Sequence, residues 1–78
     1  MTVKYKHMQK VLSAAFIRSV VKAGRYGDGN GLYLIVDSSG AKRWVLRTVV
    51  MNKRRDIGLG GLSLVSLAEA REEATRLR

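Results

Sequence analysis

The sequence predicts an α+β domain in which a three-stranded antiparallel β-sheet packs on a C-terminal α-helix and follows a short N-terminal helix. Residues 31–60 contain three apolar runs that alternate as strands do, with turn signals between them. A helical repeat of apolar residues precedes these runs and a helix with a capping signal follows them, which gives the order α-β-β-β-α. A chain of 78 residues allows one small domain with a thin core.

The N-terminal part is predicted to be a basic arm followed by a short helix. Residues 1–10 carry three lysines and no clear pattern, so we expect a flexible arm; a second interpretation is that this arm reaches a groove or phosphates. In residues 11–21 apolar side chains recur at i, i+4, with Ser13 as the candidate N-cap. Gly24 is expected just beyond the end of this helix. We therefore predict one domain over residues 11–78, with residues 1–10 as its arm.

The three predicted strands lie between glycine- and asparagine-containing turns. Residues 24–31 hold four glycines and are expected to form a turn-rich connection, in which Tyr26 is a candidate anchor for a short edge strand. The turns between the strands are expected at Asp37–Gly40 and around Asn52. The strands themselves are predicted at Leu32–Val36, Arg43–Val50 and Arg54–Leu59.

The alternation along these strands separates an apolar face from a basic face. Burial of the apolar face against the C-terminal helix would contribute about 1.5–3 kcal/mol for each large side chain. The apolar face is predicted to consist of Leu32, Leu34, Val36, Trp44, Leu46, Ile57 and Leu59. The opposite face is predicted to carry Tyr33, Ile35, Arg43, Val45, Arg47, Val49 and Arg54.

The C-terminal helix carries the clearest local signal. Ser66 and Glu69 have the spacing of a capping box, in which each side chain bonds the backbone N–H of the other residue. An apolar stripe that includes Ala70 and Ala74 follows at helical spacing, and the small alanines allow close packing on a sheet. No capping residue or helix breaker precedes the last residue, Arg78, so we expect that the chain continues in a longer protein.

The composition favours a polyanionic partner and argues against an enzyme. Fifteen Lys and Arg against six Asp and Glu give a net charge of +9, as expected of a chain that binds DNA, RNA or an anionic membrane. No apolar run approaches the ~20 residues that span a bilayer. With no cysteine and one histidine, a thiolate or multi-histidine metal site within one chain is excluded, and no nucleophile–base pair is found. We expect no catalytic residue, no metal and no cofactor.

Four segments occur in the order GRYGDGNGLYLIV, SGAKRWVLR, GLG and VSLAEAR. Together they resemble the N-terminal arm-type DNA-binding domain of phage and prophage integrases, which are tyrosine recombinases. The resemblance covers roughly residues 12–78. Two departures are a missing glycine in the turn near Asn52 and Leu62-Ser63 in place of a tyrosine-proline pair.

The resemblance implies a function in DNA integration and recombination without catalysis by this chain. It implies that the sheet enters the major groove at arm-type sites, and that a core-binding and a catalytic domain follow in the full-length integrase. The His-x-x-Arg motif and the nucleophilic tyrosine of the recombinase active site are not found in this sequence. The expected partners are therefore double-stranded DNA, the other integrase domains and other integrase protomers, with no membrane. The expected location is cytoplasmic and nucleoid-associated, in a bacterial or phage-encoded protein.

The candidate DNA-binding residues follow from the basic face and the turns. Arg43 and Arg47 are suited to bidentate bonds with guanine, whereas Lys42, Lys53 and Arg55 lie near turns, where phosphate contacts are expected. One alternative is that Arg43 and Arg47 are merely solvated, and another is that the N-terminal helix covers the apolar part of this face. The full set is Tyr33, Lys42, Arg43, Val45, Arg47, Lys53, Arg54 and Arg55.

Two other functions fit the same order of elements. A double-stranded RNA-binding module also suits α-β-β-β-α, but it depends on a lysine-rich start to its last helix, which here begins SLAEAR. A protein-interaction domain is the other alternative, with Leu62, Leu64 and Val65 as the candidate surface.

Overall fold

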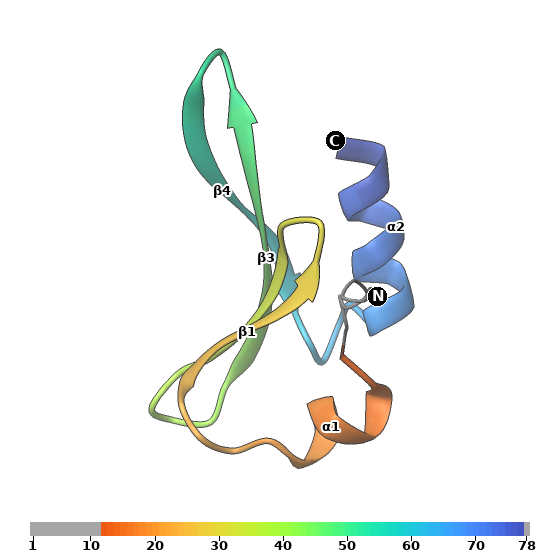
Figure 1. Cartoon of the computed structure of the whole chain (residues 1–78). Helices are drawn as coiled ribbons and strands as arrows, with labels where there is room; N and C mark the ends of the chain where they lie inside the picture. The colour runs from red at the N-terminus through yellow and green to blue at the C-terminus, as the bar shows by residue number, and fades with distance from the viewer. Residues whose placement is uncertain (1–11, 78) are drawn as a thin grey trace, which may run out of the picture.

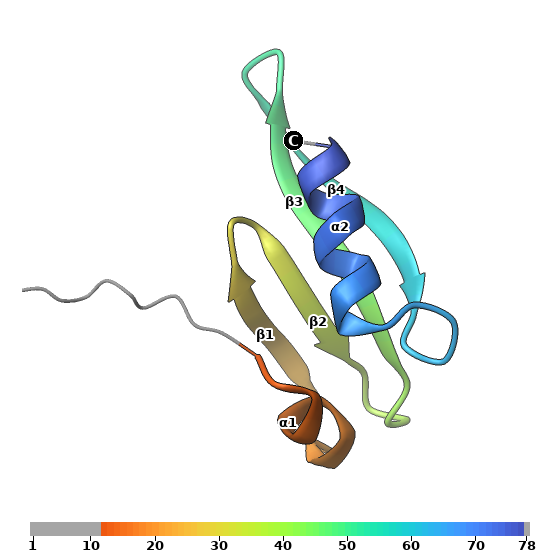
Figure 2. The ribbon, with the colours of Figure 1, turned by 90° about the vertical axis from the view of Figure 1, so that its right-hand side faces the viewer.

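The structure, a computed structural model, describes residues 12–77, and the predicted arm over residues 1–10 lies outside this part. One antiparallel sheet has the strand order β1-β2-β3-β4. Helix α2 covers one face of the sheet, and α1 lies at one end on that same side (Figure 1, Figure 2). The elements are α1 (Ala14–Ser19), β1 (Gly24–Gly29), β2 (Leu32–Val36), β3 (Lys42–Val50), β4 (Lys53–Gly61) and α2 (Leu67–Leu77).

The prediction of a three-stranded sheet is wrong, because the glycine-rich segment forms a fourth strand, β1. It pairs antiparallel with β2, so that Tyr26 lies opposite Leu34 and Gly27 opposite Tyr33. The Tyr26 ring packs against the core, and its hydroxyl donates to the Lys22 carbonyl at 2.6 Å. Glycine composition indicates a turn, but here one inward tyrosine and the pairing with β2 outweigh that preference.

Within residues 24–31, the positive φ angles cluster at the end of β1 and in the turn that follows it. Gly29, Asn30 and Gly31 have φ values of 101°, 57° and 87°, in the left-handed region that glycine and asparagine tolerate. A Cβ at Gly31 would lie 2.4 Å from the Arg47 carbonyl oxygen of β3, so the close approach of two strands requires glycine at this position.

Helix α1 is shorter than the prediction. Ser13 is its N-cap, as predicted, because the Ser13 hydroxyl accepts a hydrogen bond from the Phe16 N–H at 3.1 Å. The helix ends at Ser19, since Val20 is already extended with φ −69° and ψ 132°. The expectation that Gly24 follows the end of the helix is therefore wrong. Consecutive β-branched residues at this end favour the extended backbone over another helical turn.

The core lies between the inner face of the sheet and α2, as predicted. Trp44 is fully buried at its centre, and the indole Nε1–H donates to the Val65 carbonyl at 2.8 Å. Ile57 and Leu59 of β4 are partly buried at the edge of this core. The buried apolar residues are Ile17, Leu32, Leu34, Val36, Trp44, Leu46, Ala70 and Ala74.

The β3–β4 hairpin extends past the other strands. Strand β2 pairs with β3 only as far as Leu46, so residues 47–56 form a two-stranded ribbon whose tip projects beyond the rest of the sheet (Figure 1). Met51 and Asn52 make the turn at the tip, with φ values of 52° and 65°. Two consecutive left-handed residues are typical of a type I′ turn, whose twist matches that of the flanking strands.

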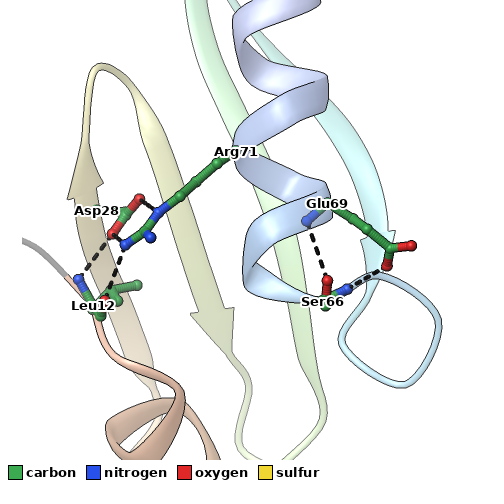
Figure 3. A network of polar contacts seen from close by, with 5 residues as sticks. All are labelled: Leu12, Asp28, Ser66, Glu69 and Arg71. Atoms are coloured by element: carbon green, nitrogen blue, oxygen red, sulfur yellow. Dashed lines mark hydrogen bonds and ion pairs between the residues drawn. The ribbon is translucent and has the colours of Figure 1, made fainter.

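Helix α2 begins with the predicted capping box (Figure 3). The Ser66 hydroxyl accepts from the Glu69 N–H at 3.1 Å, and the Glu69 carboxylate accepts from the Ser66 N–H at 2.9 Å. Two backbone N–H groups at the start of the helix are thereby satisfied, which fixes where α2 begins.

A buried carboxylate joins three segments that are far apart in the sequence (Figure 3). Asp28 of β1 is 8% exposed and accepts from Nε and Nη2 of Arg71 on α2, both at 2.8 Å. It also accepts from the Leu12 N–H at 2.8 Å, and Arg71 donates to the Leu12 carbonyl at 3.0 Å. The hydrogen bond from Asp28 raises the pKa of Arg71 above its ordinary value. This pair fixes β1 and the start of α1 to α2.

Replacing Arg71 by alanine should lower the free energy of unfolding by about 1–3 kcal/mol, because a buried carboxylate loses its charged partner. The loss stays below that of a fully buried pair, since the Arg71 side chain is 46% exposed. Urea unfolding followed by the fluorescence of Trp44 measures it. The matched control is Arg76→Ala, which removes an exposed ion pair with Glu73 on the same helix and should change stability little. Equal effects of the two substitutions would contradict this role of Asp28.

Candidate nucleic-acid interface

The sheet face opposite α2, here called the outer face, is uncovered in the described part of the chain. Strand alternation places Arg43, Val45 and Arg47 of β3 on this face, because Trp44 and Leu46 between them are buried. Helix α1 buries Ile17 in the core on the other side. The alternative that the N-terminal helix covers the outer face is therefore wrong.

The register of the four strands arranges this face in rows. One row runs from Arg25 through Ile35 to Arg43, and the next from Tyr33 through Val45 to Gly58. A shallow hollow lies over the second row, with Val45 and Gly58 among its lining residues and arginines around it. The outer face thus has an apolar centre and a cationic rim.

Gly58 leaves the centre of the hollow open. A Cβ added at Gly58 would meet no heavy atom within 4 Å, and its backbone lies outside the left-handed region. The fold therefore does not require glycine at this position. The missing side chain allows a ligand to approach the sheet backbone closely.

Arg47 and Asp56 form an ion pair across β3 and β4. Arg47 donates from Nε to Oδ1 at 3.0 Å and from Nη2 to Oδ2 at 3.4 Å. The hydrogen bond from Arg47 lowers the pKa of Asp56, and the charges of Arg25 and Arg54 add to this effect. The same hydrogen bond raises the pKa of Arg47. Both groups are therefore charged at neutral pH, and the arginine fork has a defined orientation.

Arg25 is a cation of the outer face that the sequence prediction missed. Its guanidinium carbon lies 5.6 Å from the centre of the Tyr33 ring, within the range of a cation–π interaction. The sequence predicts a turn-rich connection over residues 24–31, so it assigns Arg25 to no face of the sheet. Alternation around the inward Tyr26 is the signal that would have found it.

The predicted DNA-binding residues do not all lie together. Lys53 and Arg55 pair with Val50 and Thr48 in the ribbon. Each is one residue away from Arg54, so both point to the side of the ribbon opposite to Arg54. Of the predicted DNA-binding residues, those that the structure brings to the outer face are Tyr33, Arg43, Val45, Arg47 and Arg54.

Lys42 lies apart from the outer face. Its Nζ donates to the Ile17 carbonyl at 2.7 Å and to the Arg18 carbonyl at 3.2 Å, at the C-terminal end of α1. A cation is favourable at this end of a helix, where carbonyl groups lack helical partners. The structure thus gives Lys42 a capping contact, and its predicted phosphate contact stays a prediction.

The described residues offer few features for other kinds of site. No group of three His, Cys, Asp or Glu side chains suited to a metal ion is found among residues 12–77. Within the same range, neither helix has the length and apolar character needed to cross a membrane.

Comparison with known proteins identifies a family and two relatives of this chain. Residues 10–78 match the family of arm DNA-binding domains. The chain is similar to the integrase of Shigella phage Sf6 and to the prophage integrase IntS of Escherichia coli strain K12, in each case 44% identical over 57 residues. That match covers 73% of the chain and 15% of each relative, so the chain corresponds to a small part of these integrases.

Replacing Lys42 by methionine should destabilise the domain by about 1 kcal/mol, because the α1 carbonyls lose a charged donor while the aliphatic stem is kept. Thermal and urea unfolding measure the change. Lys53→Met removes the same charge from an exposed position near the ribbon tip and is the matched control, expected to leave the unfolding midpoint nearly unchanged. If Lys42→Met unfolds like the control, the capping contact contributes nothing to stability.

Proposed function

Because the chain belongs to the family of arm DNA-binding domains, we propose that it binds double-stranded DNA at the arm-type sites of a phage or prophage integrase. The parent protein is proposed to be a tyrosine recombinase, in which a core-binding domain and a catalytic domain recombine the DNA. The chain itself would bind DNA without cutting it, and its partners would be those other domains and neighbouring protomers. A cytoplasmic location follows from DNA as the partner.

The observation that carries this proposal is an outer face with arginines around an apolar hollow. The net charge of +9 attracts a polyanion, but it does not distinguish DNA from other anions. A sheet that has its core on one side and a cationic, partly apolar surface on the other is suited to a groove with both phosphates and base edges. The major groove of B-DNA admits a two-stranded ribbon, which is the form of residues 47–56.

The roles of the side chains follow from their positions. Arg43 and Arg47 would donate to base edges, and Val45 beside Tyr33 would contact thymine methyl groups. Arg54 on the outer face, together with Lys53 and Arg55 on the other side of the ribbon, would contact the phosphates on the two sides of the groove. Phosphate contacts set the orientation of the sheet, whereas the central side chains select the sequence.

DNA is a better fit than duplex RNA. The major groove of A-form RNA is deep and narrow, so a ribbon and sheet face cannot reach its base edges. The RNA-binding alternative relies instead on basic residues at the start of the last helix, where α2 has the Ser66–Glu69 capping box.

Gly58→Val should block DNA binding without unfolding the domain. The new side chain enters the open hollow and meets no protein atom at its Cβ, while valine suits a strand better than glycine does. We expect an unchanged or higher melting temperature and roughly tenfold weaker binding or worse, equivalent to the loss of about one good contact. Fluorescence anisotropy with a duplex selected by the wild type from a randomised library measures the affinity.

The control for Gly58→Val is Ala68→Val on α2, an exposed position on the opposite side of the sheet. This variant should bind the same duplex as the wild type does. If Gly58→Val binds this duplex as tightly as the wild type does, a close approach of DNA to the outer face is contradicted.

Binding should also depend steeply on salt, because phosphate contacts release counterions. The logarithm of the association constant is expected to fall by ~0.9 for each phosphate contacted, per tenfold rise in salt concentration. Lys53→Ala should reduce this slope by about one contact. Titrations over a range of salt concentrations, with a mixed-sequence DNA duplex, measure the slope.

Arg18→Ala is the control for that slope, since Arg18 lies on α1, at the other end of the domain from the ribbon tip (Figure 2). It should leave the slope unchanged. A flat salt dependence of the wild type, or tighter binding to an RNA duplex of equal length, would refute the proposed function.

A further inference from the structure

Asp56 places a negative charge among the arginines of the outer face. It bonds Arg47 directly, and Arg25 and Arg54 also act on its charge. A surface that only attracted phosphates would bind them more tightly without this carboxylate. A cross-strand pair of exposed charges contributes little to stability, so the fold alone gives a weak reason for an acid at this position.

The geometry of the pair leaves part of the arginine fork available. A guanidinium has five N–H donors in one plane, and the bonds to Asp56 use Nε and one hydrogen of Nη2. The edge formed by Nη1 and the second hydrogen of Nη2 can therefore bind another pair of acceptors. Each Asp56 oxygen accepts one bond from Arg47 and retains a lone pair for a further donor. The pair thus presents two donors beside an acceptor.

We propose that Arg47 and Asp56 together select a G·C base pair in the major groove, an inference that rests on the proposed DNA binding. Guanine presents two acceptors, O6 and N7, to which Arg47 donates through its remaining edge. The partner cytosine presents the N4 amino group, from which Asp56 accepts. The order of donors and acceptor on the protein matches that of one base pair.

The same pair rejects A·T. Adenine places the N6 amino group where guanine has O6, so a donor of Arg47 would face another donor. Thymine places the O4 acceptor toward the Asp56 carboxylate, and two acceptors repel one another. Asp56 also repels phosphates, which lowers binding to DNA of any sequence and so raises the ratio of specific to non-specific affinity. Asp56 is thus a specificity-determining residue that also positions Arg47.

The test is selection of binding sites from DNA duplexes with a randomised centre, carried out with the 78-residue wild type and with Asp56→Asn and Arg47→Ala. The wild type should select sites that share a G·C pair. In both variants, the preference for G·C over the other base pairs at that position should fall by roughly 5- to 150-fold, the range for a bidentate base contact. Asp56→Asn should also bind mixed-sequence duplexes more tightly than the wild type, because a negative charge has left the surface.

Glu72→Gln is the matched control, since it removes one negative charge from an exposed position on α2 and should keep the G·C preference. Melting curves verify that each variant is folded. The inference would be overturned if Asp56→Asn kept the G·C preference. It would also be overturned if the wild type bound duplexes but selected no G·C pair. DNA binding itself would stand in both cases. A wild type that binds no duplex would instead refute the proposed function itself.

Discussion

The burial of Trp44 determines which side of the sheet faces outward. The indole is fully buried at the centre of β3, and its bond to the Val65 carbonyl holds the segment before α2 against the sheet. Because side chains alternate along a strand, an inward Trp44 requires Arg43 and Val45 to point outward. A one-residue slip of β3 would bury the arginines and expose the tryptophan, so the core and the outer face are specified by the same register. The arginines need no stabilising contact of their own to be presented on one surface.

The parts of the fold that the sequence predicts are those with local causes. Strand β2 has the predicted bounds, β3 begins one residue earlier than predicted, and β4 is longer at both ends, because alternation marks the middle of a strand better than its limits. The capping box of Ser66 and Glu69 depends on spacing alone and is confirmed. For β1, the sequence offers only Tyr26 as the anchor of a candidate short edge strand, because glycines give no apolar alternation. The bond between Asp28 and Arg71 joins residues 43 positions apart, and no local pattern indicates such a partner.

In the candidate site, too, local sequence patterns predict which face a side chain lies on but not its tertiary contacts. Alternation correctly brought Arg43, Val45 and Arg47 to one face, but it says nothing about what each cation contacts. The charge of Lys42 near a turn predicts a phosphate contact, whereas the structure shows that its Nζ donates to α1 carbonyls, a tertiary contact between segments 25 residues apart. The sequence assigns Arg25 to no face, because residues 24–31 have no apolar alternation. The fourth strand therefore changes the surface as well as the fold, because it adds a cation beside Tyr33 and widens the sheet.

Two glycines of β4 differ in whether the fold requires them. Gly60 has φ +117°, and a Cβ there would lie 2.9 Å from a methyl carbon of Val65, so the fold requires glycine next to the bulge where β4 shifts register on β3. Gly58, two residues earlier, has ordinary backbone angles and open space where a side chain would be. Glycine weakens a strand, so its presence at Gly58 is unfavourable to the sheet. The proposed DNA partner supplies a reason for this glycine, because it would approach the backbone at the centre of the outer face.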